Sequence, residues 1–268
     1  MSAALLSVEG FSGAFRSRAG MLTPVLHGVT YQLRPGAITA VVGETGSGKS
    51  LVALSILGLQ PPGFVRTSGR ILFRGVDLLT QGRRALRAIR GRQISLVFQD
   101  ARAALNPVFT VGRQLADVHR LQHGSTQAEA MRQAVLALQR VSIPEPERRA
   151  RQYPHEFSGG MAQRAMIAMA ALICEPALLI LDEPTTGLDV TIQSEIMDLI
   201  VDLSRSRGLT TCLITHDLGV VAETCDDVVV MSAGQVVETG SGEAVFTRPQ
   251  HGYTRRLLAA SRLTEAAA

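Results

Sequence analysis

The stretch Gly43-Glu44-Thr45-Gly46-Ser47-Gly48-Lys49-Ser50 decides the fold of this 268-residue chain, because it matches the pattern GxxxxGK[ST] in full. Lys49 is the only lysine among 27 basic residues, and all the others are arginine. Placed at random among those positions, the lone lysine would fall here about one time in 27. A compact ammonium on a flexible stem fits between phosphate oxygens where a planar guanidinium does not. The composition therefore indicates a phosphate-binding loop.

The residues on either side of this loop support that interpretation. Residues 37–42, AITAVV, predict a short buried strand, and residues 51–59 predict a helix. Strand, glycine-rich turn and helix is the arrangement in which backbone N–H groups surround an anion at a helix N-terminus. In that arrangement Ser50 places its hydroxyl on Mg²⁺. We therefore predict a P-loop that binds a nucleotide rather than a glycine-rich surface turn.

A pair of adjacent acids follows a second apolar run. Residues 178–181, LLIL, are followed directly by Asp182, Glu183 and Pro184. A buried strand that ends in acids delivers them to the edge of a parallel sheet, where ligands bind in such folds. Successive strand residues point to opposite sides, so we expect one acid to serve Mg²⁺ and the other to orient or deprotonate the attacking water. The alternative is that the two acids cap the helix that follows.

A second glycine-rich helix start lies upstream of that acidic pair. Ser158-Gly159-Gly160 precedes residues 162–174, a strongly apolar segment that predicts a buried helix. A serine and two glycines alone are a common turn, but their placement one helix and one short turn before the acidic strand indicates a second anion-binding helix start. The commonest guanine-binding proteins also need the motif NKxD, which is impossible here because Lys49 is the only lysine. We therefore expect an enzyme other than a GTPase.

The overall composition limits the classes of partner and compartment. Hydrophobic residues make up 46% of the chain and charged residues 19%, which indicates a globular fold rather than disorder. The net charge of +4 is mild and dispersed, so no nucleic-acid partner is expected. The longest apolar run, residues 165–174, is too short to cross a bilayer. Three widely spaced cysteines without a CxxC motif fit a reducing cytoplasm.

Taken together, these motifs resemble the ATP-binding cassette of ABC transporters, over about residues 5–258. Residues 43–50 resemble Walker A, and residues 178–183 resemble Walker B with its catalytic glutamate. Residues 158–163 are similar to the signature, with Met161 where many cassettes carry glutamine. Gln99 resembles the Q-loop glutamine, and residues 186–189 resemble the D-loop. His216 resembles the switch histidine, and Phe15 resembles the aromatic residue that stacks on adenine. For the last of these, Phe11 is a rival, and Phe15 could instead belong to the core.

The resemblance implies a set of roles for these residues. Those that would bind ATP are Phe15, Gly43, Glu44, Thr45, Gly46, Ser47, Gly48, Lys49, Ser50, Leu51, Ser158, Gly159, Gly160 and Asp189. Those that would serve Mg²⁺ are Ser50, Gln99 and Asp182, and those with catalytic roles are Glu183, His216 and Gln99. The family also implies that two cassettes bind two ATP molecules head to tail, with the signature of one covering the P-loop of the other.

The expected architecture is an α/β P-loop core with an antiparallel β subdomain and an α-helical subdomain. We expect the core and β subdomain in residues 1–98, with β-structure near Ser7, residues 30–33 and residues 69–74. A helical insert that contacts a membrane partner would occupy residues 99–157. The core would continue through residues 158–247, and a short C-terminal helix and tail would form residues 248–268.

Two features inside the predicted insert have local explanations. Thr126 and Glu129 predict a capping box that opens a helix running to Arg140. The basic run Arg148, Arg149 and Arg151 predicts a solvated face rather than a site for lipid or nucleic acid. The insert has no sustained heptads, which argues against the long coiled-coil arms of chromosome-maintenance and recombination ATPases.

Longer strings narrow the resemblance to the cassettes of dipeptide, oligopeptide and nickel importers. These strings are residues 98–115, 153–169 and 182–199, and residues 250–255 resemble the HPYTR element of that group, with Gly252 where proline is usual. The resemblance implies a peripheral subunit at the cytoplasmic face of the inner membrane, driving uptake of peptides or of nickel or a metal chelate. Its partners would be two permease subunits, a second, non-identical cassette and an extracytoplasmic solute-binding protein. The alternatives are a soluble cassette ATPase of DNA repair or translation and the cassette of an exporter.

Overall fold

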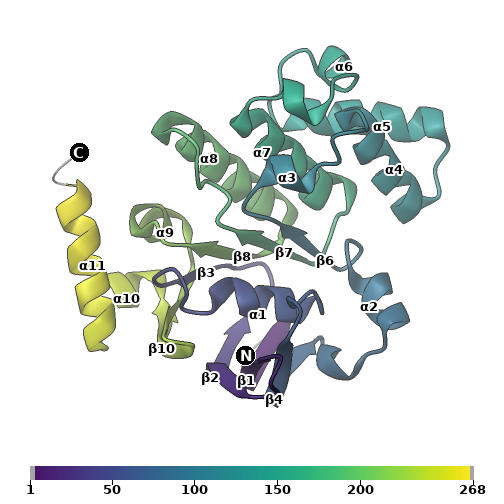
Figure 1. The fold of residues 1–268 in the computed structure, drawn as a ribbon. Helices are drawn as coiled ribbons and strands as arrows, with labels where there is room; N and C mark the ends of the chain where they lie inside the picture. The colour runs from purple at the N-terminus through teal and green to yellow at the C-terminus, as the bar shows by residue number, and fades with distance from the viewer. Residues whose placement is uncertain (1–3, 266–268) are drawn as a thin grey trace. The chain divides into compact units, whose positions relative to one another are not determined.

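Strand β3 (Ile38–Val42) leads directly into the glycine-rich loop and lies among parallel neighbours. The computed structural model describes residues 4–265 (Figure 1). The chain forms two compact units, Met1–Arg87 with Thr210–Ala268, and Ala88–Leu209. In the first unit, β3 pairs in parallel with both β8 (Thr210–Thr215) and β9 (Asp227–Ser232). Strand β10 (Gln235–Ser241) pairs antiparallel to β9. All five residues of β3 are buried, which confirms the predicted strand.

Helix α1 (Lys49–Ile56) begins immediately after the loop and confirms the predicted helix. It begins two residues before the predicted start, because the loop's Lys49 and Ser50 already belong to its first turn. It ends at the C-cap Leu57, and Gly58 then adopts a left-handed backbone conformation with φ 62°. Glycine adopts that conformation without the steric penalty that other residues incur. This accounts for the end of α1 at Ile56, three residues before the predicted end at residue 59.

The predicted antiparallel subdomain is present in the first unit as a four-stranded sheet. Its strands follow the order β2-β1-β4-β5. Their bounds are β1 (Leu6–Arg16), β2 (Leu22–Leu33), β4 (Phe64–Phe73) and β5 (Val76–Asp77). Buried and more exposed residues alternate along much of β1, as expected for a strand with one face on a core. A short 3-10 turn (Leu78–Thr80) follows β5, and α2 (Arg83–Ile89) carries the chain into the second unit.

The C-terminal helices of the first unit pack on its parallel strands. They are α9 (Leu218–Thr224), α10 (Gly242–Thr247) and α11 (Gly252–Glu265). Figure 1 shows α11, in yellow, next to α10. Side chains from these helices, including Val221, Val245 and Leu258, share one buried cluster with Val42 of β3 and Val230 of β9. This packing ties the C-terminal helix to the strand that carries the loop.

The second unit combines two parallel strands with most of the helices. Strand β6 (Ile94–Val97) pairs in parallel with β7 (Leu178–Asp182), which confirms the predicted strand before the acids. Its longer helices are α4 (Val111–His123), α5 (Gln127–Arg140), α7 (Gly159–Ile167) and α8 (Val190–Arg207). Shorter pieces are α3 (Ala101–Ala104), α6 (Pro146–Arg149) and a 3-10 turn (Pro154–Glu156). The predicted helical insert, residues 99–157, lies within this unit.

The predicted apolar helix at residues 162–174 is present but changes its winding. Helix α7 ends at Ile167 and continues as a π-helix (Ala168–Ile173), whose side chains are almost all buried. The Cys174 N–H donates to the Met169 carbonyl, five residues back, as a π-turn requires. A hydrophobic pattern cannot distinguish this wider turn from an α-turn, because both bury a continuous apolar segment.

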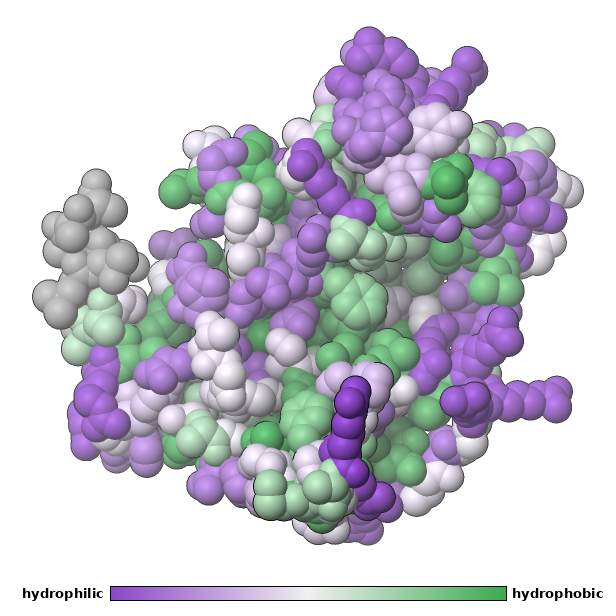
Figure 2. Space-filling view, viewed as in Figure 1, coloured by the Kyte–Doolittle hydropathy of each residue, from purple (hydrophilic) through white to green (hydrophobic). Residues whose placement is uncertain are grey.

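Of the capping box predicted at Thr126 and Glu129, the structure shows the bond to the Thr126 hydroxyl, and the Glu129 carboxylate pairs instead with Gln133 and Arg132. The Thr126 hydroxyl accepts from the Glu129 N–H at 3.3 Å and caps α5, which ends at Arg140 as predicted. Of the basic run, Arg148 and Arg151 are exposed, and Figure 2 shows hydrophilic residues over the region of α6. None of the helices within residues 4–265 combines the length and the apolar content that crossing a bilayer requires.

Candidate functional site

The glycine-rich loop has the backbone geometry of an anion site. Gly43, Gly46 and Gly48 have φ angles of 147°, 83° and 99°, which side-chain-bearing residues rarely adopt. A Cβ on Gly43 would also overlap the carbonyl oxygen of Met231 in β9. Gly48 is the N-cap of α1 and makes no side-chain cap hydrogen bond, and the N-terminus of a helix that follows such a loop is suited to binding an anion.

Lys49 places its positive charge beneath this loop. Its side chain is 5% exposed, and Nζ donates to the Gly43 carbonyl at 2.7 Å, the Glu44 carbonyl at 2.9 Å and the Ser47 hydroxyl at 3.3 Å. An ammonium and the N–H groups of a helix start are complementary to phosphate oxygens. The donors in this loop therefore fit a nucleotide phosphate.

Parts of the chain that are distant in sequence hold the loop in place. The hydroxyl of Tyr253, at the start of α11, accepts a hydrogen bond from the Glu44 N–H at 3.1 Å. The Gly234 N–H, in the turn between β9 and β10, donates to the Ser47 carbonyl at 3.1 Å. No local sequence signal predicts a role for Tyr253 at the loop, because the contact spans 209 residues.

His216 lies at the same end of the parallel strands as the loop. Val42 of β3 is in register with Thr215 of β8, so Gly43 and His216 each follow directly after that aligned pair. His216 is exposed, and the next residue, Asp217, caps α9. The first unit therefore brings His216 and the glycine-rich loop to one edge of its parallel strands, where ligands bind in such folds, and the role of His216 as the switch histidine remains a prediction.

The two candidate adenine-stacking aromatics lie in different environments on β1. Phe11 is completely buried in the core. Phe15 is half-buried, and its ring meets that of Phe64 edge-on, with centroids 5.7 Å apart. Of the two, Phe15 retains the ring surface that a nucleobase needs, and its role in stacking remains a prediction.

In the second unit, two hydrogen bonds converge on the carboxylate of Glu183. The Gln99 amide nitrogen lies 3.2 Å from Glu183 Oε2, and the Thr186 hydroxyl donates to the same oxygen at 2.9 Å. The strand register explains the first bond, because Val97 of β6 pairs with Leu181 of β7 and places Gln99 and Glu183 two residues beyond. The motifs in the sequence give Thr186 no individual role. A hydroxyl three residues after an acid in a turn can nevertheless indicate a hydrogen bond to that acid.

Glu183 also has an unusual backbone. Its φ is 47°, a left-handed conformation that costs a non-glycine residue about 1–2 kcal/mol. The Thr186 N–H donates to the Glu183 carbonyl at 3.2 Å and closes the turn that imposes this conformation. Strained residues of this kind cluster at functional sites, where the surrounding structure holds them. Asp182, the last residue of β7, precedes this turn and is half-buried.

At the signature, the polar side chains act as helix caps. The Ser158 hydroxyl accepts from the Met161 N–H at 3.2 Å and begins α7, and the Asp189 carboxylate accepts from the Ile192 N–H at 3.0 Å and begins α8. These two helix starts pack together, because a Cβ on Gly160 would lie 2.7 Å from the Ile192 Cγ2 atom. Direct ATP contacts by Ser158, Gly160 and Asp189 remain predictions.

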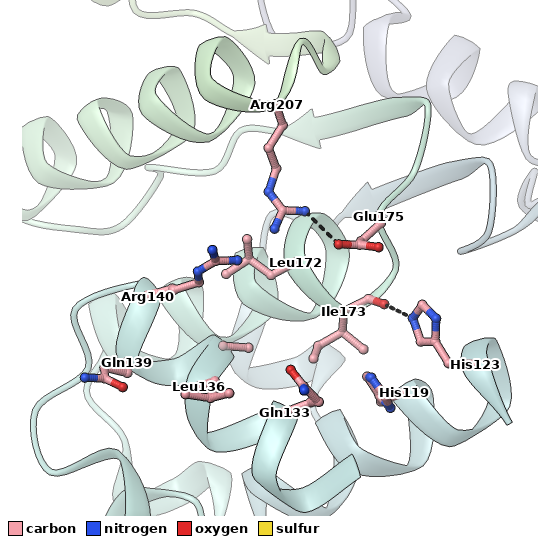
Figure 3. Close-up of a pocket in the computed structure, with 11 residues that line it drawn as sticks. His119, His123, Gln133, Leu136, Gln139, Arg140, Leu172, Ile173, Glu175 and Arg207 are labelled. Atoms are coloured by element: carbon pink, nitrogen blue, oxygen red, sulfur yellow. Dashed lines mark hydrogen bonds and ion pairs between the residues drawn. The ribbon is translucent and has the colours of Figure 1, made fainter. Parts of the chain in front are cut away.

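A separate cavity of about 630 Å³ lies in the helical part of the second unit. Figure 3 shows Arg207 paired with Glu175 on one side and His123 bonded to the Ile173 carbonyl on the other, with His119 beside it. None of the described residues that line this cavity is a predicted nucleotide or Mg²⁺ ligand. It is therefore distinct from the motifs above.

Comparison with known proteins identifies the class. The profile of the ABC transporter family matches residues 26–186, which include the P-loop, the Q-loop glutamine, the signature and the acidic strand. The chain belongs to this family and is its ATP-hydrolysing cassette.

Individual relatives give a narrower picture. The chain is 51% identical to the peptidoglycan transport ATP-binding protein YejF of Agrobacterium fabrum over 96% of its own length, and spans about half (47%) of that protein. It is 51% identical to the probable peptide transporter ATP-binding protein y4tR of Sinorhizobium fredii, covering 88% of this chain and 71% of the relative. It is 48% identical to the dipeptide transport protein DppD of Bacillus subtilis, covering 95% and 76%.

Solved cassettes share the fold. The structure of cbiO1 from Clostridium perfringens, part of the transporter complex cbiONQ, has a TM-score of 0.77 and 30% identity, covering 98% of this chain and all of that one. The dimeric cassette MJ0796, bound to ADP and Pi, also has a TM-score of 0.77, at 24% identity, covering 88% of this chain and 98% of that one. The α/β P-loop fold with an antiparallel sheet and added helices, predicted from the sequence, is confirmed.

Proposed function

We propose that this chain is the ATPase subunit of a membrane importer for peptides. The observation that carries the proposal is the 48–51% identity with y4tR and DppD, whose names describe peptide and dipeptide transport, over most of this chain. The strings at residues 98–115 and 182–199, which resemble peptide and nickel importers, support the same conclusion. Peptides are favoured over nickel because the relatives reported above are named for peptides or peptidoglycan.

The first unit would bind the nucleotide. Lys49 and the N–H groups of the loop would hold the β- and γ-phosphates, and Phe15 would stack on the adenine. His216, which shares the sheet edge with the loop, would contact the γ-phosphate. The remaining loop residues would contribute backbone and hydroxyl groups.

The second unit would supply the group that activates water. Glu183 would polarise the attacking water, and its two hydrogen bonds from Gln99 and Thr186 would hold the carboxylate in position. Gln99 and Asp182 in the second unit, and Ser50 in the first, each offer an oxygen atom, the donor that Mg²⁺ prefers. When bound, Mg²⁺ would neutralise charge on the phosphates. Because Gln99 uses its nitrogen toward Glu183, its oxygen is the atom suited to the metal.

A second cassette would complete the machinery. Residues 158–160 would cover the P-loop of the partner cassette, where the N–H groups at the start of α7 would meet the γ-phosphate and exclude water. We propose that the partner is non-identical, as in the importers that this sequence resembles. Charge complementarity between the N-terminus of α7 and a phosphate supports the placement of residues 158–160 over the partner's P-loop.

The permease contact would lie on the helical insert. Val108 is 70% exposed and Tyr153 40% exposed, and their segments are adjacent because the Val111 N–H donates to the Gln152 carbonyl at 2.8 Å. Exposed large apolar side chains on neighbouring segments are suited to docking a partner. We propose two permease subunits here, a position on the cytoplasmic face of the inner membrane, and an extracytoplasmic solute-binding protein reached through the permeases.

A native pull-down tests this assembly. Tagged Glu183→Gln chain, held with ATP and Mg²⁺ at low turnover, should recover two polytopic permeases and a second cassette, identified by mass spectrometry. The Val108→Asp chain is the matched control, and it should recover the second cassette with less permease. Recovery of ribosomes or DNA-repair factors in place of membrane proteins would overturn the proposal, and permeases that carry solute outward would indicate an exporter.

The solute is tested on the recovered complex. The captured solute-binding protein should bind di- or oligopeptides in a titration and should bind neither free Ni²⁺ nor a nickel chelate. Tight binding of nickel with no binding of peptide would overturn the peptide assignment while leaving the importer assignment intact.

A further inference from the structure

The C-terminal turn before α11 reaches back to the phosphate-binding loop. Tyr253 is 8% exposed, and its ring packs in the buried cluster with Val42 of β3 and Val230 of β9. Its hydroxyl accepts from the Glu44 N–H at 3.1 Å. Glu44 itself is exposed, so this bond ties an exposed residue of the loop to a buried anchor.

The turn that carries Tyr253 is held in place by Glu238 of β10. The Glu238 carboxylate accepts from the Gln250 N–H at 2.7 Å and the His251 N–H at 3.0 Å, using both of its oxygens. The His251 ring nitrogen Nδ1 then accepts from the Tyr253 N–H at 3.1 Å. Arg255 closes the same turn, because its guanidinium donates to the carbonyls of Pro249 and Gln250. A continuous set of hydrogen bonds therefore runs from Glu238 to Tyr253.

This arrangement constrains the part of the loop that precedes the phosphate-binding amides. Gly43 is confined on one side by the Met231 carbonyl, and Glu44 is confined next to it by the Tyr253 hydroxyl. Preorganised donors bind an anion more tightly than donors that must be ordered on binding. Without the hydroxyl, the loop would lose one fixed point just before Gly46 and Lys49.

We propose that Tyr253 is a positioning residue for ATP binding, acting through the Glu44 N–H to hold the P-loop in its binding conformation. The inference rests on the proposed binding of ATP at residues 43–50. It assigns the turn at residues 250–255 a function in the nucleotide site, in addition to its packing in the core.

The test compares Tyr253→Phe with Tyr31→Phe in the full-length chain. Both variants keep a buried ring and remove one hydroxyl, but Tyr31 lies in β2 of the antiparallel sheet, away from the loop's hydrogen bonds. We expect Tyr253→Phe to raise the Kd for Mg·ATP about two- to tenfold, the loss of one hydrogen bond's net contribution. Tyr31→Phe should bind ATP as the unchanged chain does.

Two further readouts separate positioning from general stability. In the Tyr253→Phe chain, the Tm without nucleotide should fall no further than in Tyr31→Phe, and in the assembled complex KM for ATP should rise while kcat is kept. The Glu238→Gln variant should raise the Kd in the same direction by a smaller factor. An unchanged Kd in Tyr253→Phe, or a rise matched by Tyr31→Phe, would overturn the inference.

Lys49→Ala keeps the two proposals distinguishable. If the unchanged chain binds ATP and Lys49→Ala does not, the proposed site stands and the Tyr253 comparison decides the inference. If Lys49→Ala binds ATP as tightly as the unchanged chain, the assignment of the P-loop fails, and the Tyr253 inference fails with it.

Discussion

The chain has two glycine-rich helix starts, residues 43–50 before α1 and residues 158–160 before α7, and they use glycine for different reasons. In the first, Gly46 and Gly48 have positive φ angles and no side chain caps the helix. In the second, neither glycine has a positive φ, Ser158 caps the helix, and Gly160 packs closely against Ile192. One start uses glycine for the backbone conformations of the loop, and the other uses small residues to bring two helices together.

The largest expected effect separates binding from turnover. Glu183→Gln removes the base from the second unit and should lower steady-state ATP hydrolysis in the assembled complex by about 10²–10⁴-fold while ATP still binds. Lys49→Ala, in the first unit, should abolish binding itself. The measurements are ATP turnover and equilibrium binding on the same preparations. Steady-state hydrolysis retained by Glu183→Gln would refute the role of that carboxylate.

The packing role of Gly160 predicts a rescue. Gly160→Ala places a methyl group 2.7 Å from Ile192 Cγ2 and should destabilise the chain by about 1–3 kcal/mol through overpacking. Ile192→Ala removes the obstructing methyl, so the double variant should recover part of that loss. Denaturant unfolding of the four proteins gives the coupling free energy. Strictly additive effects would show that the two residues do not compete for space.

The backbone role of Gly46 predicts the opposite behaviour. Gly46→Ala meets no atom within 4 Å but keeps a φ of 83°, so it should cost about 1–2 kcal/mol of stability or loop order. No neighbouring truncation should relieve that cost. Gly46→Asn is the matched control, because asparagine tolerates a positive φ better than alanine and should lose less. Equal losses in the two variants would argue against backbone strain as the cause.

A smaller effect is expected at Thr186. Thr186→Val keeps the shape of the side chain but removes the hydroxyl that donates to Glu183, so turnover should fall about two- to tenfold with ATP binding unchanged. Thr186→Ser restores the donor and should recover most of the rate. Failure of serine to restore turnover would indicate that the methyl group, not the hydroxyl, matters.

The smallest effect is a pH dependence in the first unit. Partial burial raises the pKa of Glu238, but hydrogen bonds from Gln250, Thr254 and His251 outweigh it and leave the pKa below its ordinary value. Its contribution to stability is therefore fully present above about pH 4.3, the unfolded value, and is lost as the pH falls through the lowered folded value. The Tm difference between the unchanged chain and Glu238→Gln should be constant from pH 8 to 5 and shrink below that. A difference that grows on acidification would contradict the sign.

Features of this chain that depend on neighbouring residues are predictable from the sequence, and features that depend on packing are not. The strand before the glycine-rich loop, the helix after it and the N-cap at Thr126 depend on contacts within a few residues, and the structure confirms each of them. Phe11 and Phe15 could not be separated by pattern, because both are aromatic residues in one strand and only the packing buries the first. The π-helix at Ala168–Ile173 could not be predicted either, because the apolar pattern of the segment fits an α-helix equally well.

The sequence by itself determined the class of protein, because its motifs specify the local backbone conformation and the charge at the residues that form them. A lone lysine in a glycine-rich turn, and an apolar strand that ends in two acids, carry that information locally. The tertiary structure alone decided which distant groups support the motifs. Tyr253 reaches Glu44 across 209 residues, and Gly160 meets Ile192 across two helix starts. Such contacts depend on how strands and helices pack, and packing distances are not encoded in the spacing of residues along the chain.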